Sequence, residues 1–142
     1  LSSLLQLVSG DHLAYTNRGS ITVSLVVHSV TTMGAEYANA ESENNQGNDC
    51  FKRGLFEQAI YHYSGAIELA VEGEEEVLIK AVNNRAMASL KLEQYEDCIE
   101  DCSFVLETLP HHQKALYRRA TAYKKLELYD DAYTDFTVLA AL

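Results

Sequence analysis

The feature that most constrains the fold is a segment that recurs after 34 residues. The stretch KLEQYEDCIEDCSFVL, which begins at Lys91, aligns with KLELYDDAYTDFTVLA, which begins at Lys125. Identical residues in this one register are Lys80 and Lys114, Arg85 and Arg119, Ala86 and Ala120, Leu92 and Leu126, Glu93 and Glu127, Tyr95 and Tyr129, Asp97 and Asp131, and Asp101 and Asp135. So many identities indicate a repeated structural unit.

An earlier copy of the unit precedes these two, at a shift of 39 residues. In this register Glu57 aligns with Glu96, and Ile60 aligns with Ile99. The five additional residues match the acidic stretch Glu72–Glu76, which we expect to form a longer, solvated turn between the first two copies. The chain therefore contains three copies of one unit.

Each copy is predicted to form two amphipathic helices. Apolar residues recur at helical spacing in the first copy, at Phe56, Ala59, Ile60, Tyr63 and Ala66. Turns between the two helices are expected at Gly54 and at Glu93-Gln94. Pro110 falls where the second copy ends, a position that stops a helix.

A period of 34 residues with two helices per unit resembles the tetratricopeptide repeat (TPR) family. The resemblance covers residues 40–142 and implies an all-α fold, a TPR helical-hairpin solenoid of three repeats at about 41–74, 79–110 and 113–142. The small residues of the family are matched by Gly47, Ala59, Ala66, Ala86, Ala120 and Ala132, while Cys98 and Val105 replace alanines.

Residues 1–40 form an N-terminal segment of unknown role. Its β-branched run at 21–30 is compatible with a strand or with a short buried helix. The run is too short to cross a bilayer.

Composition excludes several classes of function. The net charge of −10 argues against binding to nucleic acid or to an anionic membrane surface. The three cysteines lack a disulfide framework and are expected to be free thiols in a reducing, cytoplasmic environment. Cys98 and Cys102 lie four residues apart, but no further ligands at metal-binding spacing accompany them. We therefore expect core packing for this pair, with no metal and no cofactor.

Stacked helix pairs place their first helices along a concave groove. The residues that recur at this phase are Asn48, then Lys80 and Asn84, then Lys114 and Arg118. Two cations flanked by carboxamides form a compact site for a carboxylate, because the cations supply charge-assisted hydrogen bonds and the amides donate without repulsion. Any one of these residues alone is more simply interpreted as a solvated surface residue, but their recurrence across three repeats favours a site.

The set resembles the dicarboxylate clamp of TPR co-chaperones, which hold the C-terminal Glu-Glu-Val-Asp of seventy- and ninety-kilodalton heat-shock chaperones. That family has Lys-x-x-x-Asn, then Asn, then Lys-x-x-x-Arg. This chain has Asn44-x-x-x-Asn48, then Asn84, then Lys114-x-x-x-Arg118, so four of five positions match. The stretches NNRAMASLKLEQYEDCIEDC and KALYRRATAYKKL are most similar to the myosin-folding UCS-domain chaperones and the chaperone-organising co-chaperones.

The resemblance implies a peptide-binding role for these five residues. Asn44 stands where the family has lysine, and the loss of one cation would weaken a carboxylate ligand by about ten- to a hundredfold. Lys80 is expected to compensate in part, and Lys91 is a candidate for contact with a flanking acidic residue.

Two alternatives remain open at this point. The first is a structural assembly scaffold whose groove holds an internal partner segment without a carboxylate clamp, which the substitution at Asn44 favours. The second is a regulatory domain of a larger enzyme. The chain itself is not predicted to be an enzyme, because it lacks GxSxG, P-loop, HExxH and dinucleotide motifs. His111 and His112 are interpreted as polar loop residues.

Overall fold

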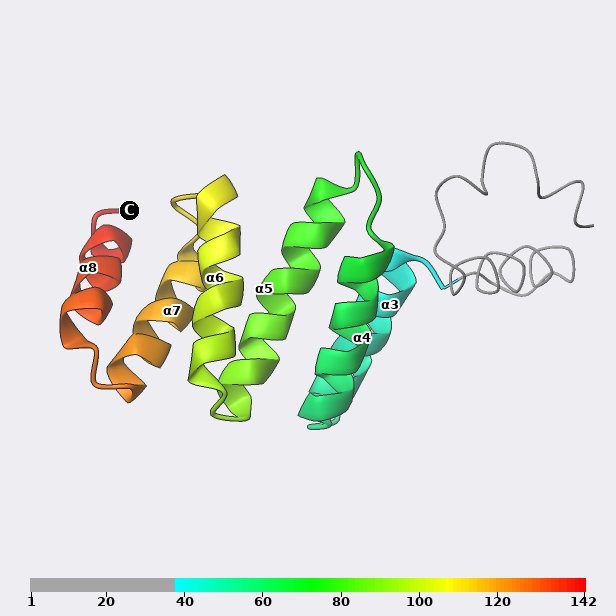
Figure 1. The fold of residues 1–142 in the computed structure, drawn as a ribbon, viewed down its shortest axis with the longest axis horizontal. Helices are drawn as coiled ribbons and strands as arrows, with labels where there is room; N and C mark the ends of the chain where they lie inside the picture. Colours follow the sequence, from blue (N-terminus) through cyan, green and yellow to red (C-terminus); the bar gives the residue numbers. More distant parts are fainter. Residues whose placement is uncertain (1–37) are drawn as a thin grey trace, which may run out of the picture. The chain divides into compact units, whose positions relative to one another are not determined.

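The computed structural model describes residues 38–142, and every regular element in that range is an α-helix (Figure 1). The helices are α3 (Ala40–Lys52), α4 (Phe56–Leu69), α5 (Glu75–Lys91), α6 (Tyr95–Thr108), α7 (Gln113–Lys125) and α8 (Tyr129–Ala140). The predicted all-α fold is confirmed for this part of the chain. The interpretation of the N-terminal segment, including the run at 21–30, falls on residues that lie outside the described range.

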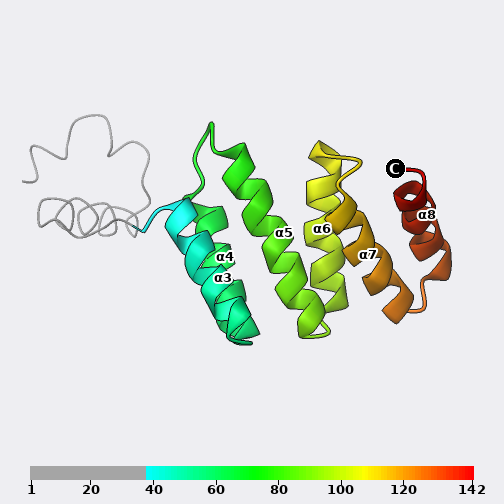
Figure 2. The ribbon, with the colours of Figure 1, turned by 180° about the vertical axis from the view of Figure 1, so that it is seen from behind.

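The helices are arranged as three consecutive hairpins, α3 with α4, α5 with α6 and α7 with α8. Contacts between neighbouring hairpins include α3 with α5 and α5 with α7, whereas α4, α6 and α8 do not contact one another. In Figure 1 α4 and α6 lie in front of α3 and α7, and Figure 2 shows the reverse. Because the first helices of the hairpins approach one another more closely, they line the concave face, as the repeat pattern predicts.

The turn inside each hairpin has the same conformation although its sequence varies. Gly54 has a φ of +76°, and the equivalent residues Glu93 and Glu127 have φ values of 60° and 62°. The next residue in each turn donates its backbone N–H to a carbonyl of the preceding helix at 2.9 Å: Leu55 to Cys50, Gln94 to Ser89 and Leu128 to Tyr123. This is a left-handed C-terminal cap, which glycine adopts without strain and glutamate does not.

Small residues allow the helices to approach. Ala59, Ala86 and Ala120 are completely buried, and so are Cys98 and Cys102, which confirms that the cysteine pair packs in the core. The predicted role of Gly47 has a specific cause. A Cβ atom at Gly47 would lie 2.5 Å from the ring of Tyr63, so the absence of a side chain lets α3 pack directly on the α4 tyrosine.

The acidic stretch Glu72–Glu76 is only partly a turn. Helix α5 begins at Glu75, four residues before the predicted start of the second repeat, so the additional residues lengthen the helix as well as the loop. Glu75 and Glu76 occupy the first turn of α5, where negative charge interacts favourably with the positive end of the helix dipole.

Candidate functional site

Three asparagines on the concave face form a hydrogen-bond network centred on Asn84. Asn44 and Asn48 come from α3, and Asn84 comes from α5. The Asn84 Nδ2 atom lies 3.2 Å from the Oδ1 atoms of both α3 asparagines. Asn44 is only 7% exposed, so it belongs to the packed base of this network. The fold thus brings together three residues that the sequence assigned to one site.

The network is held from behind by Tyr63 of α4. Its hydroxyl donates to Asn48 Oδ1 at 2.9 Å. Burial, together with the nearby Cys50 thiol, raises the pKa of Tyr63 to about 12, so the hydroxyl keeps its proton and acts as a donor at neutral pH. Asn48 Oδ1 therefore accepts from Tyr63 and Asn84. The sequence pattern identified Tyr63 only as an apolar helix position, and no sequence signal indicated this contact.

On the α7 side of the face, the guanidinium of Arg118 is fixed by uncharged partners. Its Nη1 atom donates to the backbone oxygen of Asn83 at 2.8 Å and to Asn83 Oδ1 at 2.6 Å. Its Nη2 atom lies 3.2 Å from Met87 Sδ. Burial lowers the pKa of Arg118, yet a guanidinium remains charged at neutral pH. Within residues 38–142, no carboxylate forms an ion pair with it.

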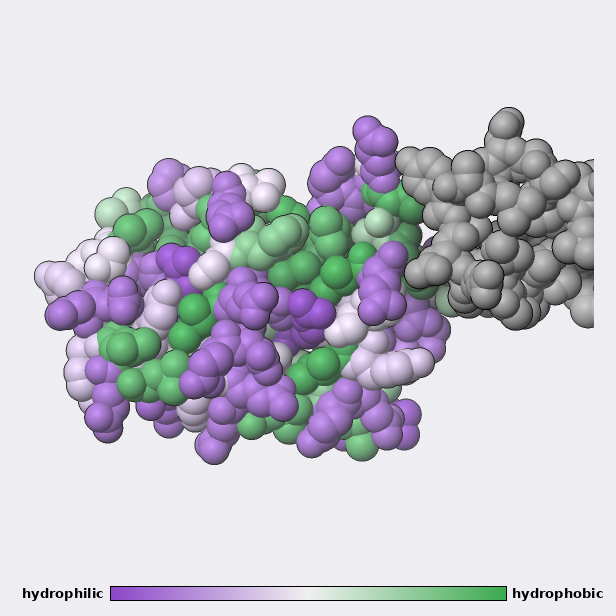
Figure 3. All heavy atoms as spheres, viewed as in Figure 1, coloured by the Kyte–Doolittle hydropathy of each residue, from purple (hydrophilic) through white to green (hydrophobic). Residues whose placement is uncertain are grey.

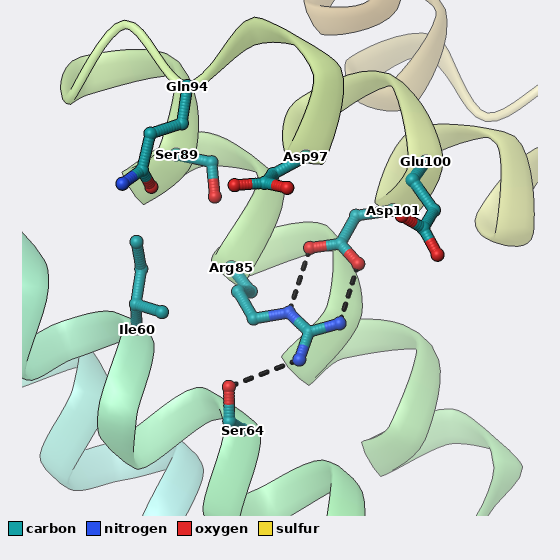
Figure 4. A pocket seen from close by; sticks show the side chains of 8 residues that line it. All are labelled: Ile60, Ser64, Arg85, Ser89, Gln94, Asp97, Glu100 and Asp101. Atoms are coloured by element: carbon teal, nitrogen blue, oxygen red, sulfur yellow. Dashed lines mark hydrogen bonds and ion pairs between the residues drawn. The ribbon is translucent and has the colours of Figure 1, made fainter.

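Two other half-buried arginines have acidic partners. Arg85 makes a bidentate pair with Asp101 at 2.9 and 2.7 Å, and it also donates to Ser64 of the preceding hairpin at 3.1 Å (Figure 4). Arg119 repeats this arrangement with Asp135, at 2.7 Å for both bonds, and with Ser103 at 3.0 Å. Both pairs fall on identities of the 34-residue register, so their repetition was visible in the sequence although their pairing was not.

The pocket around Arg85 has a volume of about 260 Å³ and is lined by residues of α4, α5 and α6. Its guanidinium is already neutralised by Asp101, so it offers no free positive charge to a ligand. Figure 3, drawn from the same side as Figure 1, shows hydrophilic and hydrophobic residues interspersed on that face rather than a continuous apolar patch. We therefore place the candidate site on the concave face.

Two open depressions of about 540 Å³ each flank Lys114 on the concave face. The first is mainly apolar and is lined by Met87, Leu90, Lys91, Gln113, Tyr117, Arg118 and Leu139. The second is lined by Ile79, Lys80, Asn83, Asn84, His111, His112 and Gln113. Lys114 is exposed and belongs to both, so this cation lies between a mainly apolar depression and one of mixed polarity.

The remaining residues that the sequence predicts for the site differ in whether their side chains are free to contact a ligand. Lys80 pairs with Glu76 at 2.6 Å, one helical turn away, and both side chains are largely exposed. Such surface pairs are weak. Lys91 is exposed at the end of α5. His112, interpreted as a loop residue, is instead the N-cap of α7, because its Nδ1 atom accepts from the backbone N–H of Ala115 at 3.2 Å.

Three stacked helical hairpins with a polar, partly cationic concave face are the architecture of a helical-repeat protein. No family model matches the chain. The mitochondrial import receptor subunit TOM70 of Rattus norvegicus is 37% identical over 79 residues, which is 56% of this chain and 13% of the receptor. The Hsp70/Hsp90 co-chaperone CNS1 of Saccharomyces cerevisiae is 38% identical over 86 residues, 60% of this chain and 22% of that protein. The chain thus spans less than a quarter of these relatives.

The solved structures that resemble this chain cover more of its length. The second TPR of Spaghetti (RPAP3), bound to the HSP90 peptide SRMEEVD, is 34% identical, with a TM-score of 0.66 over 73% of this chain and 92% of that one. The myosin chaperone UNC-45 of C. elegans, in complex with an Hsp90 peptide, is 28% identical, with a TM-score of 0.65 over 72% of this chain and 12% of that one. The chain belongs to the TPR family, as its sequence predicts. Among the described helices, none has the length and hydrophobicity needed to span a bilayer.

Proposed function

We propose that this chain is a co-chaperone TPR module that binds the acidic C-terminal tail of a heat-shock chaperone of the seventy- or ninety-kilodalton class. The tail would lie along the concave face formed by α3, α5 and α7. The observation that carries the proposal is the half-buried Arg118 guanidinium, whose partners within residues 38–142 are all uncharged. A desolvated charge is costly unless an opposite charge compensates it, and a ligand carboxylate would supply that charge.

The charge distribution supports this assignment. The chain has a net charge of −10, yet Lys91, Lys114 and Arg118 line one depression on the concave face. A local positive field attracts an acidic peptide even on an acidic protein. The apolar lining contributed by Met87 and Leu90 would accommodate an apolar side chain of the same peptide.

The relatives support the same class of ligand. CNS1 is named as a co-chaperone of Hsp70 and Hsp90, and both the Spaghetti and the UNC-45 structures contain an Hsp90 peptide. A cytoplasmic location is part of the proposal. It rests on Cys50, Cys98 and Cys102, all of which are free thiols, as is usual in a reducing compartment.

The direct test is calorimetric titration of the chain with a peptide ending in Glu-Glu-Val-Asp. Its control is a Gln-Gln-Val-Asn peptide with an amidated end, which lacks every carboxylate. We expect the acidic peptide to bind at least about tenfold more tightly, and Lys114→Ala to remove about tenfold of that affinity.

The matched control variant is Lys125→Ala, at the other end of α7 and outside both depressions, which should leave the affinity unchanged. Equal affinity for the two peptides, or equal effects of the two substitutions, would contradict the proposal. Such a result would favour the assembly scaffold, which predicts binding of an apolar segment regardless of carboxylates.

A further inference from the structure

The two ends of the concave face differ in charge. At the α7 end, Lys114 and Arg118 carry positive charges, and within residues 38–142 neither is paired with a carboxylate. At the α3 end, the groups that form the base of the groove are the neutral carboxamides of Asn44 and Asn48. The two ends therefore present different chemistry to one ligand.

Near the α3 end, the charged residues of the described part include two glutamates and one lysine that already has an acidic partner. Glu41 and Glu43 lie in the first turn of α3, and Glu43 contacts the ring of His62 on α4 at 2.8 Å. Lys80, the cation on α5 beside Asn84, is already paired with Glu76 at 2.6 Å. The hydrogen bond with Glu76 raises the pKa of the Lys80 amine, and the negative charges of Glu76 and Glu41 raise it further. The electrostatic environment of this end is thus neutral to acidic.

The hydrogen-bond network determines what this end offers. Asn84 Nδ2 donates to the Oδ1 atoms of Asn44 and Asn48, and Tyr63 donates to Asn48 as well. The amide oxygens are therefore engaged inside the protein. The Nδ2 groups of Asn44 and Asn48 make no hydrogen bond to any other residue of the described part, so each retains N–H donors for a ligand oxygen.

We infer that the concave face recognises one carboxylate and one uncharged oxygen, rather than two carboxylates. This inference rests on the proposed function and specifies the ligand. The ligand is a peptide tail whose single essential carboxylate binds Lys114 and Arg118. A neutral carbonyl or amide oxygen of the same tail binds Asn44 and Asn48. Asn44 is the residue that determines this selectivity.

The physical reason is the difference between neutral and charged donors. A charge-assisted hydrogen bond is about twice as strong as a neutral one. A carboxylate at the α3 end would lose hydration without meeting a cation, whereas an amide or carbonyl oxygen has less hydration to lose. A second carboxylate therefore adds little affinity there.

The test on the unmodified chain uses four versions of one acidic tail. The last residue is Asp or Asn, and its terminal carboxyl is free or amidated, so that the end carries two, one or no carboxylates. We expect one of the two single-carboxylate peptides to bind within about threefold of the full tail. The other should bind about as weakly as the peptide with none. Comparable losses of about tenfold for both single-carboxylate peptides would overturn the inference.

Substitutions give an independent readout. Asn44→Lys adds a cation to the neutral end, and it should tighten the two-carboxylate tail about tenfold while changing the preferred single-carboxylate tail by less than about threefold. Lys80→Ala should reduce affinity less than Lys114→Ala does, because Lys80 already has a carboxylate partner at 2.6 Å and Lys114 has none among the described residues. An equal gain for both tails, or a loss from Lys80→Ala as large as that from Lys114→Ala, would contradict the inference.

The failure of the proposed function would look different. In that case none of the four peptides would bind, and Lys114→Ala would have no effect. A dependence on both carboxylates, in contrast, would leave the proposed function in place and remove only the selectivity assigned to Asn44.

Discussion

The Arg118 guanidinium donates to both oxygens of Asn83, at 2.8 Å from the backbone oxygen and 2.6 Å from Oδ1. This pairing ties α7 to α5 without neutralising the charge. The adjacent Arg119 makes two 2.7 Å bonds to the buried carboxylate of Asp135 and ties α7 to α8. Two arginines that are neighbours in the chain therefore differ in their partners, and we propose that Arg118 serves a ligand whereas Arg119 serves stability.

Substitution of these arginines should separate the two roles. We expect Arg118→Met to lower the free energy of unfolding by about 1–2 kcal/mol, because the buried Asn83 loses its donor but no carboxylate is stranded, while acidic-tail binding falls about tenfold. Arg119→Met should lower the free energy of unfolding by about 3 kcal/mol, because it leaves Asp135 buried and unpaired. Urea unfolding and peptide titration of both variants check this prediction.

The double variant Arg119→Met with Asp135→Leu is the control for the predicted loss of stability in Arg119→Met. It should recover most of the lost stability, because both members of the buried pair are replaced by apolar groups. If the double variant is no more stable than Arg119→Met, the loss does not come from the stranded carboxylate.

The contact between Gly47 and Tyr63 predicts that a single added methyl group affects both fold and site. Gly47→Ala places a Cβ atom 2.5 Å from the Tyr63 ring, so α3 or the ring must move. We expect the free energy of unfolding to fall by about 1–3 kcal/mol despite the better helix propensity of alanine. Gly65→Ala on α4 is a milder comparison, because its Cβ would approach only the flexible Glu43 side chain, at 3.2 Å. Equal urea midpoints for the two variants would argue against the contact.

The left-handed turns predict a stabilising substitution. Glu93→Gly should raise the free energy of unfolding by roughly 0.5–1 kcal/mol, because a φ of 60° is strained for glutamate, and this gain exceeds the entropy cost of glycine. Gly54→Ala at the equivalent turn should do the opposite by about 1 kcal/mol, although its Cβ would meet no other atom. Thermal unfolding of both variants tests the pair. A fall in melting temperature for Glu93→Gly would contradict the inferred backbone strain at Glu93.

His112 predicts a pH dependence of stability. Burial lowers the pKa of His112, and the charges of Arg118 and Lys114 lower it further. The unfolded state, with a histidine pKa of about 6.5, therefore binds the proton more readily than the folded state. This contribution to stability is present above about pH 6.5 and is lost as the pH falls toward the lower folded pKa. Protonation of Nδ1 would also end its hydrogen bond with the Ala115 N–H.

The variant His112→Asn isolates this contribution. Asparagine is a good N-cap residue that does not titrate near neutral pH, so the helix cap is kept while the proton linkage is removed. We expect the urea midpoint of the unmodified chain to fall more between pH 7.5 and pH 5 than that of the variant. Parallel losses would show that other groups account for the pH dependence.

Much of the fold was predictable because residues at equivalent positions of each repeat have the same structural role and are therefore similar in the sequence. The 34-residue register predicted the hairpins, their turns and the buried positions of Ala86, Ala120 and Cys98. It did not predict that Glu75 and Glu76 extend α5, because an acidic run suits both a solvated loop and the first turn of a helix. It also gave no reason to assign His112 to a helix cap.

For the site, the sequence by itself determined which kinds of side chain line the concave face, because position within a repeat determines the face that a residue occupies. Only the tertiary structure decided which of them are still available to a ligand. Lys80 and Arg118 looked equivalent as cations in the groove, but Lys80 pairs with Glu76, whereas Arg118 has only uncharged partners among the described residues. The Lys80–Glu76 pair joins residues four apart on one helix, a spacing that the sequence shows. The partners of Arg118 lie on a different helix, and helical periodicity does not carry the distances between separate helices.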